Sequence, residues 1–182
     1  MKTLRHLLCW ISAAALATAA LASSAEPIIT VGQYAPRFSG HDQDGHKWEL
    51  SRYLGKKYVL LYFYPKDDTA GGTAEACGVR DNLVEFKQVG VEVVGISSDD
   101  KKSHKNFAFK YNLAFPLLAD TRGQIAEAYG ARMDGENKLD RRISFLIGLD
   151  GRILRIIDSP DPAVHLRAMG QAIVQLGRKD SL

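Results

Sequence analysis

The pattern of hydrophobic and polar positions along this chain predicts strands and helices in alternation. A continuous apolar run at 58–64 is typical of a strand that is covered on both faces, as in a parallel sheet, and 91–96 is predicted to be a second buried strand. Apolar residues spaced three and four positions apart predict a helix over 73–89, which Gly90 ends. The centre of the chain is therefore expected to fold as strand, helix and strand.

The second half of the chain adds a hairpin to this alternation. Asp150 and Gly151 form a strong turn signal between apolar runs at 143–149 and 152–157. Strand–helix alternation followed by a hairpin predicts an α/β fold, a three-layer sandwich with a central mixed β-sheet. The other predicted elements are a hairpin at 41–46, helices over 101–111, 121–129 and 162–176, and a short apolar segment at 115–118.

The N-terminal segment has the composition of a secretory signal. Lys2 and Arg5 precede an apolar run at 7–22, which is short for a membrane span, and small residues suited to cleavage follow up to Ala25. We expect residues 1–25 to be a signal peptide that is removed on export, with retention as an N-terminal anchor as the alternative. The rest, 26–182, is expected to be one domain located in the bacterial periplasm.

Composition excludes several function classes. The chain has 182 residues, 46% of them hydrophobic and 25% charged, which is ordinary for one globular domain. The formal charge of +3 comes without a cluster of Lys and Arg, so we expect no nucleic-acid partner, and no membrane contact after cleavage. The histidines lack metal-ligand spacing, so we expect surface or loop histidines and neither a metal nor a cofactor. Beyond the predicted signal, which contains His6, these histidines are His41, His46, His104 and His165.

Cysteine usage raises a question about chemistry. Cys9 lies in the predicted signal, so Cys77 is the single cysteine of the expected mature chain. In an oxidising compartment an unpaired thiol is a reactive group, an intermolecular partner or an inert buried residue.

The stretch 62–77, YFYPKDDTAGGTAEAC, is a candidate site at the end of a predicted strand. Ligands of open α/β sheets bind beyond the carboxyl ends of strands, and the loop 65–72 leaves such an end. Gly71 and Gly72 would let the backbone approach a small ligand, and free N–H groups at the helix start would hold a polar oxygen. The simpler alternative is that Thr69 and the glycines only form a turn into a capped helix.

This stretch resembles the active-site region of the peroxiredoxins, in particular their Q-type group, the bacterioferritin comigratory proteins. Pro65 and Thr69 match the family pattern Pro-x-x-x-Thr-x-x-Cys, and Cys77 lies where Q-type members commonly carry a second cysteine. The resemblance implies a thioredoxin-like fold. It continues through GQYAPRFSGHDQDG (32–45), VGISSDD (94–100), FPLLAD (115–120) and RISFLIGLDG (142–151).

The resemblance also implies roles for the residues of the site. Thr69 would orient the peroxide, Arg142 would hold the nucleophile as a thiolate, and Pro65 would shield the pocket. Backbone N–H groups near Gly71 and Gly72 would bind the peroxide oxygen. The sequence departs from the family at its centre, because Gly72 stands where the peroxide-attacking cysteine is expected.

Cys77 is the available substitute for that sulfur, but it lies five residues further on. On an ideal helix five residues correspond to a rise of roughly 7.5 Å and a rotation of about 140°, so Cys77 should point away from the pocket. It would reach the pocket only if the helix start unwinds, which Gly71 and Gly72 make less costly. Glu75 is expected in the first helical turn, where an acid is favourable, and it could also pair with Arg142.

Three interpretations remain open. In the first, which we favour, the protein is a thiol peroxidase that reduces hydrogen peroxide or small alkyl hydroperoxides through Cys77. It would use an external thiol, from a thioredoxin-like protein or a small molecule, and act as a monomer or weak dimer. In the second it is a catalytically inactive protein that binds a partner or senses oxidation. In the third, Gly72 is a substitution in an otherwise ordinary enzyme.

Overall fold

A computed structural model describes residues 29–133 and 139–179 of the chain. The predicted signal peptide, 1–25, lies outside the described residues. Among those that are described, no helix is long and apolar enough to cross a membrane.

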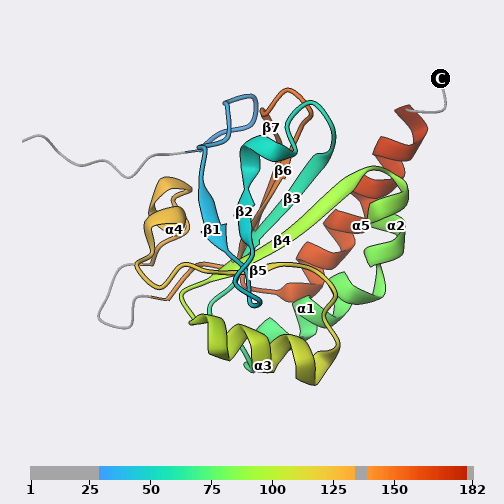
Figure 1. Cartoon of the computed structure of the whole chain (residues 1–182). Helices are drawn as coiled ribbons and strands as arrows, with labels where there is room; N and C mark the ends of the chain where they lie inside the picture. The colour runs from blue at the N-terminus through green and yellow to red at the C-terminus, as the bar shows by residue number, and fades with distance from the viewer. Residues whose placement is uncertain (1–28, 134–138, 180–182) are drawn as a thin grey trace, which may run out of the picture.

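A five-stranded mixed sheet forms the centre of the molecule, in the order β5-β4-β3-β6-β7. The strands β3, β4 and β5 run parallel, whereas β6 is antiparallel to both β3 and β7. The mixed sheet predicted from the hairpin is therefore confirmed (Figure 1). The strands are β3 Tyr58–Phe63, β4 Val91–Ser97, β5 Leu117–Ala119, β6 Ile143–Ile147 and β7 Ile153–Asp158, and a separate hairpin pairs β1 Ser39–His41 with β2 Lys47–Glu49.

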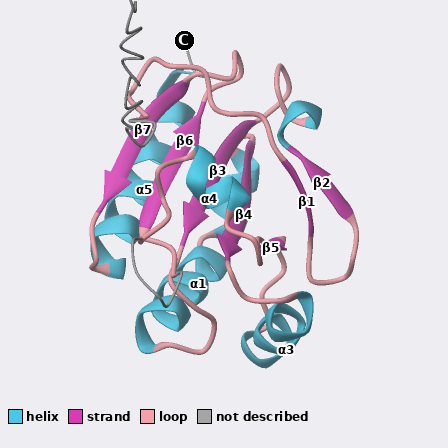
Figure 2. Ribbon diagram, turned by 90° about the vertical axis from the view of Figure 1, so that its left-hand side faces the viewer, coloured by secondary structure: helices cyan, strands magenta, loops and turns pink. Residues whose placement is uncertain are grey.

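Helices cover both faces of this sheet and complete the three predicted layers (Figures 1 and 2). Leu60 and Tyr62 of β3 point to the face that packs against α1, α2, α3 and α5, and Leu61 and Phe63 point to the face that carries α4 and the β1–β2 hairpin. These two buried clusters form the core. The helices are α1 Ala70–Asp81, α2 Leu83–Gln88, α3 Lys101–Tyr111, α4 Gln124–Ala128 and α5 Pro162–Lys179, with a 3-10 turn η1 at Leu50–Arg52.

The single helix predicted over 73–89 was wrong, because the structure has two helices there. Helix α1 begins earlier than predicted, at Ala70, since Thr69 caps it. It ends at Asp81 because the Asn82 side-chain amide donates to the Gly78 carbonyl at 2.8 Å and the Asn82 backbone leaves the helical region. Asparagine favours such side-chain to backbone hydrogen bonds over helix continuation.

Two further boundaries differ from the sequence prediction. The helix predicted over 121–129 is reduced to α4, because Gly123 has a φ of +72° and the Asp120 carboxylate accepts the first free N–H groups, those of Ile125 and Ala126. Strand β5 begins only after Pro116, whose nitrogen has no hydrogen to donate.

Candidate active site

The start of α1 lies beyond the carboxyl end of β3, as the sequence predicts. The Thr69 hydroxyl accepts a hydrogen bond from the Gly72 N–H at 3.1 Å and donates one to the Lys66 carbonyl at 2.9 Å. The helix cap that was the simpler alternative therefore exists. The single hydrogen of the Thr69 hydroxyl is donated to the Lys66 carbonyl. The hydroxyl can therefore donate to a further acceptor, such as a ligand oxygen, only if this hydrogen bond breaks.

Two glycines allow other groups to approach the first turn of α1 closely. A Cβ added at Gly71 would lie 2.7 Å from Nη2 of Arg142. A Cβ added at Gly72 would lie 2.5 Å from the Lys66 carbonyl oxygen and 2.9 Å from the Thr69 hydroxyl. The fold therefore places the Arg142 guanidinium against Gly71 and the Thr69 hydroxyl against Gly72, the next residue in the same turn.

The Arg142 guanidinium is buried and held in place by two acceptors. Its Nη1 donates to the Glu75 carboxylate, and its Nε donates to the Pro160 carbonyl at 3.2 Å. Arg142 is 8% exposed and Glu75 is fully buried. The pairing of Glu75 with Arg142 is confirmed, whereas its predicted place in the first helical turn was wrong because α1 begins at Ala70.

Behind this ion pair lies a polar network that the sequence prediction missed. His165 is fully buried, with its Nδ1 2.8 Å from the Ser144 hydroxyl and 3.5 Å from Oε1 of Glu75. Its Nε2 lies 2.9 Å from the Ser159 carbonyl, so Nε2 carries a hydrogen and Nδ1 accepts from Ser144. Burial lowers the pKa of His165, which favours this neutral form.

Glu75 has an altered proton affinity as a result of this environment. Desolvation raises the pKa of Glu75 from its usual 4.5 to about 7, and it outweighs the attraction of Arg142. Oε1 of Glu75 is buried and has no hydrogen-bond partner among the described residues. Protonation of this oxygen therefore costs less free energy than usual. Near neutral pH, Glu75 is a carboxylate paired with Arg142 in some molecules and a neutral carboxylic acid in others.

The loop that precedes α1 is anchored by a second buried histidine. Asp67 accepts from the Tyr64 hydroxyl at 2.7 Å and the Ser103 hydroxyl at 2.7 Å, and it lies 2.9 Å from Nδ1 of His104. Burial opposes the charged carboxylate, but the hydrogen bonds from His104, Tyr64 and Ser103 prevail and lower the pKa of Asp67. These contacts fix the loop from β3 to α1 against α3.

The expectation of surface or loop histidines was therefore wrong for His104 and His165. Both lie on helices and are fully buried, whereas His41 and His46 are exposed. The prediction failed because hydrophobic spacing in the sequence does not reveal which polar side chains are buried next to a hydrogen-bond partner.

A cavity of about 280 Å³ lies next to the ion pair. Pro65 and Arg142 share it, which fits a shielding position for Pro65. Asp140 also lines it; desolvation raises the pKa of Asp140 to about 7 despite its ion pair with Arg132. The remaining lining residues are Met133, Arg141, Asp158, Ser159 and Pro160.

Cys77 lies outside this cavity. It is half-buried on α1, one and a half turns after Gly72, and its thiol makes no hydrogen bond or ion pair with the side chains that the structure describes. The fold thus brings together Pro65, Thr69, Gly71, Gly72 and Arg142, but it does not bring Cys77 to them.

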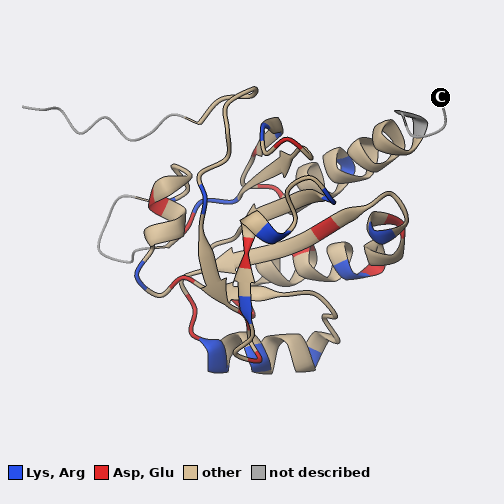
Figure 3. Cartoon of the chain, turned by 45° about the horizontal axis from the view of Figure 1, so that its top comes forward, with Lys and Arg blue, Asp and Glu red and all other residues tan. Residues whose placement is uncertain are grey.

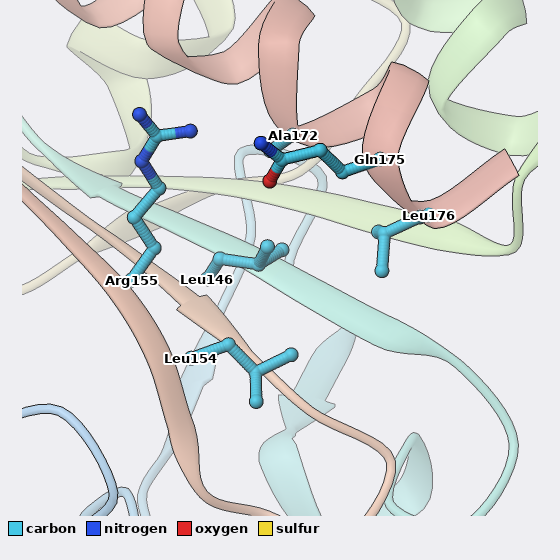
Figure 4. A pocket seen from close by; sticks show the side chains of 6 residues that line it. All are labelled: Leu146, Leu154, Arg155, Ala172, Gln175 and Leu176. Carbon is cyan, nitrogen blue, oxygen red and sulfur yellow. The ribbon is translucent and has the colours of Figure 1, made fainter. Parts of the chain in front are cut away.

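Another hollow, of about 400 Å³, lies between α5 and the β6–β7 hairpin (Figure 4). Its lining offers neither a thiol nor an acid or base of ordinary catalytic type. Over the described ranges, no group of three or more His, Cys, Asp and Glu side chains is arranged to hold a metal ion. The lining residues of the hollow are Leu146, Leu154, Arg155, Ala172, Gln175 and Leu176.

The buried carboxyls predict a pH dependence of stability. The pKa of Glu75 is higher in the folded state than in the unfolded state, so its contribution is complete below pH 4.5 and is lost as the pH rises to about 7. The loss should reach about 3 kcal/mol in the free energy of unfolding. Urea denaturation at several pH values should show this slope for wild type and a shallower one for Glu75→Gln.

A matched control is Glu85→Gln, which removes an exposed carboxylate from α2. It should retain the wild-type slope between pH 4.5 and 7. Asp140→Asn should flatten the slope as Glu75→Gln does, because the pKa of Asp140 is also raised to about 7. Equal slopes for wild type, Glu75→Gln and Asp140→Asn would contradict the raised proton affinities.

Comparison with known proteins identifies the family. Residues 31–156 match the AhpC/TSA family. Peroxiredoxin Bcp from Escherichia coli strain K12 is 43% identical over 144 residues, which cover 75% of this chain and 90% of that protein. Chloroplastic peroxiredoxin Q from Populus jackii is 41% identical over 139 residues, 76% of this chain and 65% of that protein, so the chain spans just under two thirds of its length.

Solved structures agree with this family. Peroxidoxin BcpB from Mycobacterium tuberculosis has a TM-score of 0.75 at 33% identity, covering 82% of this chain and 97% of that one. A cysteine-to-serine mutant of Xylella fastidiosa PrxQ has a TM-score of 0.74 at 25% identity, covering 84% and 98%. The predicted thioredoxin-like fold is thereby confirmed. The chain belongs to the AhpC/TSA family, among its Q-type peroxiredoxins.

Proposed function

We propose that this protein reduces hydrogen peroxide or small alkyl hydroperoxides at the expense of an external thiol, and that Cys77 is the sulfur that is oxidised. The observation that carries the proposal is the buried Arg142 guanidinium, which Glu75 and the Pro160 carbonyl hold against Gly71. Such a fixed cation beside a helix N-terminus stabilises a thiolate. The relatives named as peroxiredoxins support the same reaction.

The reaction takes place in three steps. The Cys77 thiolate attacks one peroxide oxygen, the O–O bond breaks, and Cys77 becomes a sulfenic acid while water or an alcohol leaves. An external thiol then attacks the sulfur and releases water, and a second thiol reduces the mixed disulfide to restore the Cys77 thiol.

Cys77 must approach Arg142 and Thr69 for the first step. Opening of the first turns of α1 would allow this. Gly71, Gly72 and Gly78 all lie within α1, and each disfavours helix by about 1 kcal/mol relative to alanine. We infer that α1 opens more readily than the helices around it.

Trapping of the oxidised sulfur tests the proposal. Peroxide treatment followed by dimedone should add one label at Cys77, as seen by mass spectrometry of the peptide. The Cys77→Ser variant should show no label there and no peroxide consumption with a thiol reductant. Consumption that persists in Cys77→Ser, or a wild-type protein without consumption, would overturn the proposal.

A second candidate function is a binding or redox-sensing protein without turnover. The close approach of the Lys66 carbonyl to Gly72 and the distance of Cys77 from the cavity favour it. In that case Cys77 would be oxidised stoichiometrically, and peroxide consumption would stop after one equivalent.

The place and assembly of the protein are part of the same proposal. We infer export to the periplasm and cleavage of residues 1–25 from the pattern of that segment. The protein would act there as a monomer or weak dimer.

A further inference from the structure

Helix α3 exposes a basic strip with one large apolar side chain at its centre. Phe109 is 90% exposed, and Lys102, Lys105 and Asn106 lie on the same face of the helix at spacings of three, four and seven residues. The opposite face is buried, so the helix cannot rotate to hide Phe109. We call this surface the α3 strip; it consists of Lys101, Lys102, Lys105, Asn106, Phe109 and Lys110.

The positive charge of the α3 strip is only partly neutralised. Lys105 pairs with Asp44 at 3.3 Å, and Lys110 pairs with Asp68 at 2.7 Å. Lys101 and Lys102 form no ion pair with any residue in the described part of the chain. Lys101 and Lys102 are therefore the lysines of the strip without an ion pair, although Asp99 and Asp100 directly precede them, and the lysines appear as blue segments on the lowest helix of Figure 3.

The α3 strip is connected to both ends of the helix that carries Cys77. Lys110 binds Asp68, which directly precedes the cap of α1. Near the other end, Nη1 of Arg80 donates to the Tyr111 carbonyl of α3 at 2.7 Å. Arg80 lies three residues after Cys77, on the same side of α1. The two helices lie side by side in both ribbon views (Figures 1 and 2).

We propose that the α3 strip is the docking surface of an acidic protein dithiol that reduces Cys77. This rests on the proposed function only in taking Cys77 as the redox-active thiol. An exposed aromatic side chain surrounded by charges is typical of the energetic centre of an interface. Acidic groups on the partner would complement Lys101 and Lys102 and speed the encounter.

An anionic membrane fits the α3 strip less well. The other face of α3 is fixed in the core, so Phe109 alone could enter the lipid. A basic helix that binds membranes normally presents a broad apolar face.

The experiment measures reduction of Cys77 without any peroxide. The full chain carrying Cys9→Ser is converted to the mixed disulfide between Cys77 and 5-thio-2-nitrobenzoate. A reductant thiolate attacks the Cys77 sulfur and releases the coloured 5-thio-2-nitrobenzoate anion. The second thiol of the reductant then breaks the new disulfide, leaving a Cys77 thiol and an oxidised reductant. The two reductants compared are an acidic thioredoxin and uncharged dithiothreitol.

Phe109→Ser and Lys102→Glu should each lower the second-order rate constant for the thioredoxin by about fivefold or more. Neither should change the rate with dithiothreitol. Two control variants, Val174→Ser and Lys56→Glu, alter an exposed apolar residue and an exposed lysine away from α3 and should leave both rates unchanged. Raising the salt from about 20 to 200 mM should slow the thioredoxin more in wild type than in Lys102→Glu.

Unchanged thioredoxin rates in Phe109→Ser and Lys102→Glu would overturn the docking proposal. A second outcome would also overturn it: wild type binds phosphatidylcholine vesicles with about 30% phosphatidylglycerol, and both variants lose this binding. That result would assign the strip to a membrane. The readout does not depend on peroxidase activity. The two proposals can therefore fail separately. If wild type shows no dimedone label but Phe109→Ser and Lys102→Glu still slow the reaction with the thioredoxin, the proposed function is disproved and the docking proposal stands.

Discussion

Gly72→Cys is expected to raise the rate constant for peroxide reduction by about 100-fold or more over wild type, because it places a thiol in the first turn of α1. There the new side chain lies at the helix N-terminus with its Cβ 2.9 Å from the Thr69 hydroxyl, and the Arg142 guanidinium lies against the neighbouring Gly71. Cys77, in contrast, can reach these groups only when the first turns of α1 open. Stopped-flow measurement of peroxide consumption with an excess of dithiothreitol gives the two rate constants.

The same substitution should reduce stability. Its Cβ would lie 2.5 Å from the Lys66 carbonyl oxygen, a backbone atom that moves only with the loop. That loop is anchored through Asp67 to Tyr64, Ser103 and His104, so the shift should cost about 1–3 kcal/mol. Urea denaturation measures this cost.

Gly72→Ser is the matched control, because it brings nearly the same atoms without a thiol. It should lose as much stability as Gly72→Cys and gain no activity. If Gly72→Cys folds like Gly72→Ser but consumes peroxide no faster than wild type, Thr69 and Arg142 do not form a functional peroxide site.

Removing either partner of the buried ion pair should destabilise the protein, but to different extents. Glu75→Met leaves the Arg142 charge buried without its carboxylate, and arginine cannot give up its proton, so a loss of about 3–5 kcal/mol is expected. Arg142→Met leaves Glu75, which can take up a proton, since burial raises the pKa of Glu75 to about 7 even beside Arg142. The free energy of unfolding of Arg142→Met at pH 7 should therefore fall by less than that of Glu75→Met.

The pH dependence separates the two variants further. The deficit of Arg142→Met should almost disappear at pH 5, where the carboxyl is protonated in the folded protein, and grow above pH 7. The deficit of Glu75→Met should instead shrink as the pH rises from 5 to 8, because wild type loses the contribution of Glu75 over this range and the variant has no carboxyl there to titrate. Denaturation curves at pH 5, 7 and 8 test this; equal deficits at every pH would show that Glu75 stays ionised in the fold.

Much of the fold could be predicted from local patterns. The apolar run at 58–64 and the turn signal at Asp150 and Gly151 gave the central strand and the closing hairpin in nearly their observed bounds. Helix boundaries were less predictable. The break at Asn82 depends on one side-chain hydrogen bond to Gly78, which periodicity does not register.

The candidate site was predictable only in part. The motif and its resemblance pointed to Pro65, Thr69 and Arg142, but the roles assigned to these residues stay predictions. The helical geometry also led us to expect that Cys77 would point away from the pocket. The network formed by Glu75, Ser144 and His165 was not predictable, since no sequence pattern links these positions.

The sequence by itself determined which stretches of the chain form strands and which form helices, though not where the helices begin and end, because hydrophobic spacing and turn residues act over a few neighbouring positions. It also determined that a single thiol is available in 26–182. Only the tertiary structure decided which charges are buried together. The proton affinity of Glu75 and the setting of Arg142 follow from packing α1 and α5 against the sheet, which removes water from groups that are distant in the chain.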